Sequence, residues 1–182
     1  MGQTGLSYDR QLERWTVHHR VGWLNPVFEG LSWIGGQGLV WLVIALVLAV
    51  WWRRPWLFVQ VALADLAAQL ISSGLKQWIG RARPSEVYAT PKPLVSAPHD
   101  SSFPSGHATA SFACATMLSF YAPRAAPAFF LLAAAIAWSR VYVGVHYPLD
   151  VLGGAVLGVV IAIALRWLSE ALLRSRRARR AG

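Results

Sequence analysis

The most visible pattern along the chain is a series of apolar runs separated by short polar segments. Five runs stand out, and each approaches the roughly 20 residues that a helix needs to cross ~30 Å of bilayer hydrocarbon. In lipid, a helix satisfies its backbone hydrogen bonds within one segment. The pattern therefore predicts five transmembrane helices, at residues 38–52, 56–75, about 105–121, 125–139 and 149–168.

The first 35 residues show a different pattern. Residues 7–20 alternate charged and apolar side chains at a spacing that suits a short helix lying on a membrane surface. Residues 24–34 are apolar but are interrupted by polar residues and a proline. Both segments are predicted to be interfacial, although a membrane crossing within them stays open. His18 and His19 are interpreted as surface residues, because nothing nearby supplies a third metal ligand.

Composition strengthens the membrane interpretation. Of the 182 residues, 55% are hydrophobic and 14% are charged, whereas soluble domains average roughly 45–50% and about 25%. The predicted fold class is an all-α, polytopic membrane helix bundle. We expect a single membrane-embedded domain over residues 1–182, with an interfacial segment (1–35), a catalytic bundle (36–169) and a basic cytoplasmic tail (170–182). The N-terminus lacks the basic-then-apolar order of a signal peptide.

The net charge of +9 would suggest a nucleic-acid partner in a soluble protein. Here the arginines follow apolar runs, so topology explains them better and no nucleic acid is expected. If the helices alternate, the basic turns and the basic tail share one side, which the positive-inside rule makes cytoplasmic. The tail is interpreted as a topology determinant or a contact for anionic lipids. The basic residues are Arg53, Arg54, Arg124, Arg174, Arg176, Arg177, Arg179 and Arg180.

Three polar motifs lie at the opposite ends of these helices and should converge outside. They are Lys76 to Pro84, Pro104 to His107, and Ser139 to Asp150. Lys76, Arg83 and Arg140 place three cations on one face. Convergent cations suit a phosphate, because guanidinium groups grip its oxygens in pairs and lysine supplies a point charge.

The start of the third predicted helix offers a second kind of anion site, because free N–H groups point outward there. Ser105 can cap this helix or donate to an oxygen, and Gly106 permits close backbone approach. His146 and Asp150 are four residues apart, so a carboxylate can fix the histidine tautomer and raise the basicity of the other ring nitrogen. With His107, the set suits a nucleophile and a general acid. Metal binding is the rival use, but three cations nearby argue against a divalent ion.

Two further features have open roles. Asp65 lies in mid-membrane on one polar stripe with Gln69, Ser72 and Lys76, and it serves either a structural hydrogen bond or a proton or substrate step. Residues 85–103 hold several prolines and no helical period. They are predicted to form an external loop that is either a lid or a connector, and His99 and Asp100 share that ambiguity.

The three motifs together resemble the signature of the type 2 phosphatidic acid phosphatase superfamily, which includes vanadium-dependent haloperoxidases. The matching residues are Lys76, Arg83 and Pro84; Pro104, Ser105, Gly106 and His107; and Ser139, Arg140, His146 and Asp150. The resemblance implies a core similar to the haloperoxidase helical bundle. It also implies that His146 attacks phosphorus, Asp150 orients it and His107 protonates the leaving oxygen. Lys76, Arg83, Ser105, Gly106 and Arg140 would hold the phosphoryl oxygens, and no metal or cofactor is needed.

A membrane-face site implies a lipid substrate with its phosphate at headgroup level. The run around Ser139 to Asp150 and the Asp100-Ser-Ser-Phe-Pro-Ser stretch resemble bacterial undecaprenyl diphosphate phosphatases of the bacitracin-resistance type, which act on the outer face of the cell membrane. That group often has Asp where this chain has Gly106. Phosphatidic acid, phosphatidylglycerol phosphate and a polyprenyl-phosphosugar phosphate therefore remain alternatives. A haloperoxidase and a non-catalytic lipid-binding or lipid-moving protein are the alternatives of other classes.

Overall fold

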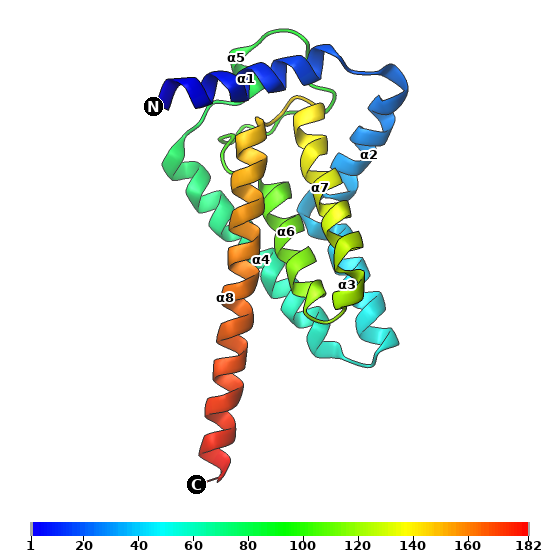
Figure 1. Cartoon of the computed structure of the whole chain (residues 1–182), viewed down its shortest axis with the longest axis vertical. Helices are drawn as coiled ribbons and strands as arrows, with labels where there is room; N and C mark the ends of the chain where they lie inside the picture. The colour runs from blue at the N-terminus through cyan, green and yellow to red at the C-terminus, as the bar shows by residue number, and fades with distance from the viewer. Residues whose placement is uncertain (1, 182) are drawn as a thin grey trace.

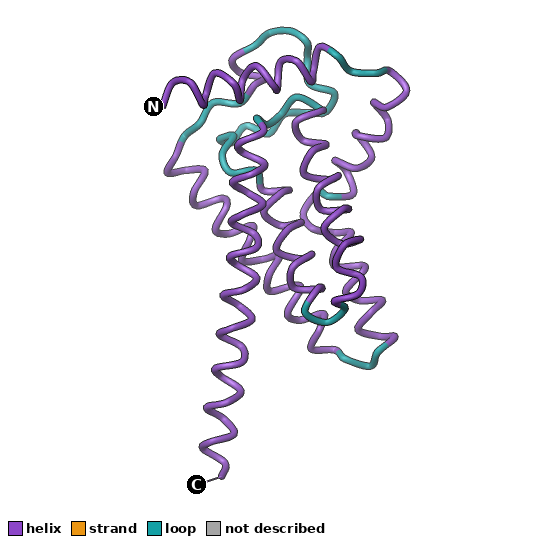
Figure 2. The backbone as a smooth tube through the Cα atoms, in the orientation of Figure 1, coloured by secondary structure: helices purple, strands orange, loops and turns teal. Residues whose placement is uncertain are grey.

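The computed structural model of the chain describes the backbone of residues 2–181 and the side chains of residues 7–36 and 38–175. Within that range every regular element is a helix, which confirms the all-α prediction (Figure 2). In chain order the helices are α1 (Gly2–His18), η1 (Gly22–Leu24), α2 (Asn25–Ile34), η2 (Gly36–Gly38), α3 (Leu39–Trp51), α4 (Pro55–Ile79), α5 (Pro84–Val87), α6 (Gly106–Ser119), η3 (Pro123–Ala125), α7 (Ala126–Tyr142) and α8 (Pro148–Ala181).

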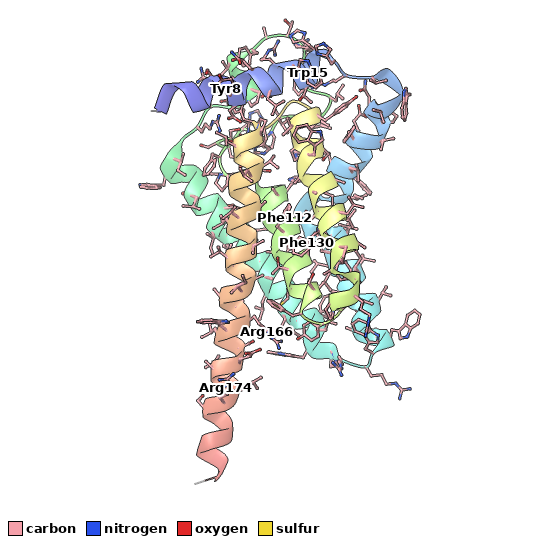
Figure 3. The ribbon with its side chains drawn as sticks, viewed as in Figure 1. Tyr8, Trp15, Phe112, Phe130, Arg166 and Arg174 are labelled. Atoms are coloured by element: carbon pink, nitrogen blue, oxygen red, sulfur yellow. The ribbon has the colours of Figure 1, made fainter. Side chains whose placement is uncertain are left out.

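Helix α6 is the centre of the bundle and packs against α4, α7 and α8. Most of its residues are small, and from Ala108 to Leu118 nearly all are buried. A Cβ atom on Gly154 or Gly158 of α8 would collide with the α6 backbone, so these glycines let the two helices approach closely. On the other side of α6, Phe112 meets Phe130 of α7 with ring centroids 6.1 Å apart (Figure 3).

The number of membrane spans differs from the prediction of five. Three segments are long and apolar enough to cross a membrane alone, namely Pro55–Val87, Pro123–Tyr142 and Pro148–Ser175. Helix α3 has 13 residues and qualifies only together with Gly22–Ile34, from which it is bent by 64°. Helix α6 has 14 residues. By length and apolarity, the described residues therefore contain three candidate spans, or four if the bent pair is one span. An apolar run in a sequence does not distinguish a lipid-facing helix from one enclosed by its neighbours.

Helix α1 lies across one end of the bundle, outside it (Figure 1). The helix predicted within residues 7–20 is present, and the face that packs on the bundle carries two carboxylates. Asp9 and Glu13 are 5% and 1% exposed, whereas Tyr8 and Trp15 lie on the outer side (Figure 3). Helix α2 packs along α7.

The two ends of the bundle differ in what they carry. One end holds α1 and the long connection after α4, and the opposite end holds the α3–α4 turn, the α6–α7 turn and the end of α8 (Figure 1). The basic segments therefore share one end, and the three polar motifs share the other, as predicted. Apart from α5, residues 85–103 contain no helix, which agrees with the predicted loop.

Candidate active site

A cavity of about 340 Å³ opens where the three motifs meet, near the α1 end of the bundle. Six of the eight predicted site residues line it, and Ser105 and Asp150 are buried. The lining residues are Gly35, Gln69, Ser72, Ser73, Lys76, Arg83, Pro98, Asp100, Gly106, His107, Ala110, Arg140 and His146. The convergence predicted from the apolar pattern is therefore present in the fold.

The end of α4 brings two cations to the cavity. Lys76 lies in the last turn of the helix. Gly80 then adopts a left-handed conformation with φ of 66° and ends α4, which costs glycine little because it has no Cβ. The chain turns there, so that Arg83 points back into the cavity that Lys76 lines.

The end of α7 brings Arg140 and His146 together. Arg140 lies in the last turn of α7, and Gly144 follows in the left-handed region with φ of 82°. The backbone N–H groups of Val145 and His146 both donate to the Arg140 carbonyl, each with a nitrogen–oxygen distance of 3.2 Å. This tight turn folds the histidine back beside the arginine that precedes it by six residues.

The start of α6 contributes the Pro-Ser-Gly-His motif. Ser105 is the N-cap residue, but its hydroxyl makes no capping hydrogen bond. A Cβ atom on Gly106 would meet only Ser72 Oγ, at 3.7 Å, so the cavity has room beside this residue. His107 Nε2 lies 3.2 Å from the Ser32 carbonyl oxygen of α2. That contact leaves Nδ1 as the nitrogen available for substrate.

Asp100 of the long loop forms ion pairs with two of the cations that line the cavity, Lys76 and Arg83. One carboxylate oxygen lies 2.6 Å from Lys76 Nζ, and the other lies 2.5 Å from Arg83 Nη2. Partial burial raises the pKa of this carboxyl, but hydrogen bonds and charge from Lys76 and Arg83 outweigh it, so the pKa is lowered below its usual value. The loop therefore contributes a side chain to the site, and Asp100 stands where an anionic ligand would bind.

The tautomer of His146 follows from its neighbours. Arg83 Nη1 lies 3.2 Å from His146 Nε2, and a guanidinium can only donate. Nε2 therefore accepts, and the ring proton is on Nδ1, which lies 3.5 Å from Asp150 Oδ2. Catalytic hydrogen bonds are often this long in ligand-free sites. Burial, with the charges of Arg83 and Arg140, lowers the pKa of His146 to about 4 against the opposing effect of Asp150.

Two buried donors in the site have no hydrogen-bond partner in the described structure, Ser105 Oγ and Arg140 Nε. Ser105 is fully buried and Arg140 is 4% exposed. Arg140 Nη1 donates to Ser32 Oγ. An unpaired buried donor costs about 1–3 kcal/mol, so these two donors favour a ligand that can accept hydrogen bonds. An anion with several oxygens would satisfy the Arg140 donor, which lines the cavity, and replace Asp100 on the cations.

The polar stripe of α4 is only partly in the cavity. Gln69, Ser72 and Lys76 line it, and Asp65 lies deeper, where it accepts a hydrogen bond of 2.7 Å from Gln69 Nε2. Asp65 thus has the hydrogen-bond partner that a structural role requires, and its role in a proton or substrate step stays a prediction. Among the described side chains, no three His, Cys, Asp or Glu residues gather closely enough to hold a metal ion.

Sequence reasoning missed four residues around the site. Ser32 of α2 contacts both His107 and Arg140. Ser102 and Arg81 donate to Asp150, and Arg81 also donates to Asp9. None of these three residues lines the cavity. A signal existed for Arg81, which stands two residues before Arg83 in the first motif, and for Asp9, which shares a helical face with Glu13. Nothing local marks Ser32, because its role depends on how α2 packs on α7.

Comparison with known proteins gives one family. The model of the PAP2 superfamily matches residues 56–174. Phosphatidylglycerophosphatase B of Bacillus subtilis is 30% identical over 185 aligned positions, covering 93% of this chain and 87% of that protein. Undecaprenyl-diphosphatase of Sulfolobus acidocaldarius is 27% identical, covering 86% of this chain and 76% of that protein.

Solved structures agree with the sequence relatives. A transmembrane PAP2-type phosphatidylglycerolphosphate phosphatase from Bacillus subtilis superposes with a TM-score of 0.76 at 28% identity, covering 93% of this chain and 88% of that chain. A bacterial vanadium-dependent iodoperoxidase shares the fold, with a TM-score of 0.59 at 22% identity, over 71% of this chain and 38% of that one. Both the family resemblance and the haloperoxidase-like core are thereby confirmed. The chain belongs to the PAP2 superfamily, as a multi-pass membrane hydrolase of the phosphatase type.

Proposed function

We propose that the protein removes a phosphate from a membrane lipid through a phosphohistidine on His146. One observation carries this proposal. Two histidines and three cations converge on one cavity, which Arg140 lines with a buried Nε that has no partner in the described structure. A phosphoryl group supplies the oxygens that such donors need, and its reacting atom would lie between the two histidines.

In the first step, the lone pair of His146 Nε2 attacks phosphorus and the bond from phosphorus to the lipid oxygen breaks. The proton on Nδ1 stays beside Asp150, which stabilises the positive charge that develops on the imidazole. His107 enters this step as an imidazolium, which the charge of the bound phosphate favours. It gives its Nδ1 proton to the leaving oxygen, while its Nε2–H donates to the Ser32 carbonyl. The products are a phosphohistidine and a lipid with a free hydroxyl, or a monophosphate if the substrate is a diphosphate.

In the second step, water attacks the phosphohistidine from the side that the lipid has left. His107 now accepts a proton from the water, the phosphorus–nitrogen bond breaks, and inorganic phosphate is released. The same group therefore acts first as acid and then as base. Lys76, Arg83 and Arg140 stabilise the charge on the equatorial oxygens, together with Ser105 and the Gly106 N–H at the start of α6. None of these steps requires a metal ion.

Undecaprenyl diphosphate is the substrate that we propose first. The Asp100-Ser-Ser-Phe-Pro-Ser stretch and the third motif resemble phosphatases of that lipid, and one of the relatives is named for this activity. Phosphatidylglycerol phosphate is the second candidate, because the relative at 30% identity carries that name. Gly106 favours phosphatidylglycerol phosphate, because phosphatases of undecaprenyl diphosphate often have Asp at this position. An Asp side chain would fill the space that the cavity has beside Gly106. Phosphatidic acid and a polyprenyl-phosphosugar phosphate are further lipids of the same chemistry.

We place the site on the outer face of a bacterial-type cell membrane. The support is the distribution of arginine, since the turns that hold Arg53, Arg54 and Arg124 lie at the end of the bundle away from the cavity. The positive-inside rule assigns that end to the cytoplasm. The basic tail at residues 170–182 then lies at the cytoplasmic surface, where it would contact anionic lipids.

The test is phosphate release by detergent-purified protein in EDTA. Undecaprenyl diphosphate, phosphatidylglycerol phosphate and phosphatidic acid are compared side by side, with His146→Ala as the control. Release that persists in EDTA and is lost in the variant supports the phosphohistidine route, and acid-labile phosphate trapped on the protein would identify the intermediate. Release that survives His146→Ala would contradict the mechanism. A wild-type protein that binds these lipids and releases no phosphate would favour a lipid-binding protein.

A further inference from the structure

A second set of charges lies behind the catalytic pair, on the side away from the cavity. Arg81 bridges two carboxylates there. Its Nη1 lies 2.5 Å from Asp150 Oδ1, and its Nη2 lies 2.5 Å from Asp9 Oδ2. Asp150 is fully buried and Asp9 is 5% exposed. One guanidinium therefore connects α1 to the carboxylate that faces His146.

Asp9 also holds the start of α8. Its second carboxylate oxygen accepts a hydrogen bond from the backbone N–H of Leu149, at 2.8 Å. Leu149 lies in the first turn of α8, where N–H groups have no partner within the helix, and it directly precedes Asp150. Asp9 thus fixes the position of Arg81, which contacts Asp150. It also fixes the backbone at Leu149, the residue before Asp150.

Arg81 and Asp150 make further contacts that fix their positions. Its guanidinium lies over the Tyr147 ring, 4.3 Å from the centroid. Its backbone carbonyl accepts a hydrogen bond of 2.7 Å from the Ser102 N–H, and the Ser102 hydroxyl donates to Asp150 Oδ2 at 2.5 Å. The Tyr147 N–H donates to the same oxygen at 2.9 Å. Asp150 is therefore surrounded by donors that leave it one orientation.

The position of this network separates it from substrate binding. The lining residues of the cavity include neither Asp9 nor Arg81 within the described part of the chain. Any effect of these residues on the reaction has to pass through Asp150 and His146. The first motif, whose Lys76 and Arg83 face the cavity, therefore also supplies a residue to the opposite side of the nucleophile.

We propose that Asp9 and Arg81 are positioning residues of the phosphatase reaction. Asp9 orients Arg81, and Arg81 keeps the Asp150 carboxylate turned toward His146 Nδ1. Helix α1 is then part of the active site, although it lies outside the membrane bundle. This inference rests on the proposed function, since it assumes that Asp150 orients a nucleophilic His146.

The arrangement also affects the pH dependence of the reaction. The charged groups that face His146 are Arg83, Arg140 and Asp150, and those that face Arg81 are Asp9 and Asp150, beside Tyr147. Arg81 offsets part of the negative charge of Asp150. Without that cation, Asp150 attracts the His146 proton more strongly and the pKa of His146 rises from about 4. Because only the unprotonated Nε2 attacks, kcat/KM should then begin to fall at a higher pH than in the wild type.

The experiment measures kcat, KM and the pH profile of the full-length protein in detergent micelles with its best lipid substrate. We expect Arg81→Gln to lower kcat by about 10- to 100-fold, the range for groups that orient a reacting residue, with KM little changed. Its acid limb should move to higher pH, and Arg81→Lys should recover part of both effects. Asp9→Asn should cause a smaller loss, and the double variant Asp9→Asn/Arg81→Gln should lose no more than Arg81→Gln alone. Arg10→Gln, which removes an exposed charge on the same helix, is the matched control.

Inhibition by inorganic phosphate distinguishes a loss of positioning from a loss of ligand binding in the cavity. A folded Arg81→Gln protein should bind phosphate as the wild type does, because the cavity is intact. Weaker phosphate binding in proportion to the loss of kcat would make Arg81 a ligand and overturn the proposal, as would an unshifted acid limb or additive losses in the double variant. If wild-type protein is active and His146→Ala is not, while Arg81→Gln matches the wild type, the positioning role alone fails. If wild-type protein releases no phosphate, the proposed function fails first.

Discussion

The two sides of His146 are built in opposite ways. Toward the cavity, Arg140 Nε lacks a partner in the described structure, and the side chains of Lys76 and Arg83 pair with the Asp100 carboxylate of a loop. Away from the cavity, both oxygens of Asp150 accept short hydrogen bonds. Buried polar groups normally find partners. The first side is thus complete only with an anion bound, whereas the second is complete without one.

This difference separates two requirements of the nucleophile that we propose. The cavity side has to exchange ligands during each turnover, so its donors cannot be permanently paired within the protein. The inner side has to keep one geometry throughout, and closed ion pairs between different helices provide that. Variants on the first side should therefore change substrate affinity together with rate, and variants on the second should change rate alone.

The largest effect on the cavity side is expected from His107→Asn. General acid catalysis contributes about 10²- to 10⁴-fold, and we expect a loss of that size with a lipid substrate, measured as kcat. With p-nitrophenyl phosphate the leaving group needs no proton, so the first step should survive. Hydrolysis of the phosphohistidine still needs the base, so the variant should release a burst of p-nitrophenolate equal to the enzyme concentration. Equal losses on both substrates without a burst would exclude His107 as the acid.

Arg140→Gln should have the next largest effect. Loss of one charge-stabilising donor costs about 10²- to 10³-fold in rate, and here KM should rise as well because Arg140 lines the cavity. Arg140→Lys should restore little, since a lysine cannot reproduce both the Ser32 contact and a free Nε–H. Ser32→Ala is the matched control and should cost far less, because it removes only one contact of the arginine. Steady-state kinetics on one lipid substrate decide this, and an Arg140→Gln variant with unchanged KM would contradict the assignment.

How much of this site could be predicted from the sequence depends on which side of His146 is considered. The cavity side was predictable, because Lys76, Arg83, His107 and Arg140 lie in short motifs at the ends of apolar runs. Helix alternation alone then brings those ends together. The inner side was not, because Asp9 and Arg81 are 72 residues apart and meet only through the docking of α1 on the bundle.

The fold shows a similar division. Periodicity and run length predicted every long helix and the loop at residues 85–103, because both are local properties of the chain. The same signals predicted five spans, whereas three helices, or four with the bent pair, pass on length and apolarity within the described residues. Helix α6 is enclosed by α4, α7 and α8. These signals also did not indicate which face of α1 packs on the bundle, because charged residues such as Asp9 and Glu13 are expected in water unless partners from distant segments are known.

A smaller effect is expected from Asp100→Asn, which tests whether the cations of the cavity are available to a ligand. The Asp100 carboxylate competes with phosphate for Lys76 and Arg83, and a site that is only partly available binds its ligand more weakly in proportion. Removing the charge should tighten inhibition by inorganic phosphate by about 3- to 10-fold on that principle. His99→Gln changes the neighbouring residue of the same loop and should leave the inhibition constant unchanged. Weaker phosphate inhibition in Asp100→Asn would mean that the carboxylate holds the cations in place instead of competing for them.

The smallest effect concerns Glu13, which lies one turn from Asp9 on the buried face of α1. Burial raises its pKa to about 7, although Arg14 and Arg20 lower it, and its Oε2 has no hydrogen-bond partner in the described structure. A glutamate whose pKa is higher in the folded protein contributes stability that is complete below its unfolded pKa and is lost as pH rises through the folded value. Helix α1 should therefore dock less tightly at pH 8 than at pH 6.

Because α1 carries Asp9, looser docking reaches the inner side of His146. We expect wild-type protein to show lower amide-exchange protection in α1 at pH 8 than at pH 6, after correction for intrinsic exchange rates, and a modest decline of kcat over the same range. Glu13→Gln stays neutral, so it should remove both differences, whereas Glu29→Gln on α2 should keep them. If protection of α1 does not change with pH in the wild type, Glu13 does not control docking. If protection changes but kcat does not, the link from α1 to Asp150 is weaker than the ion pairs of Arg81 imply.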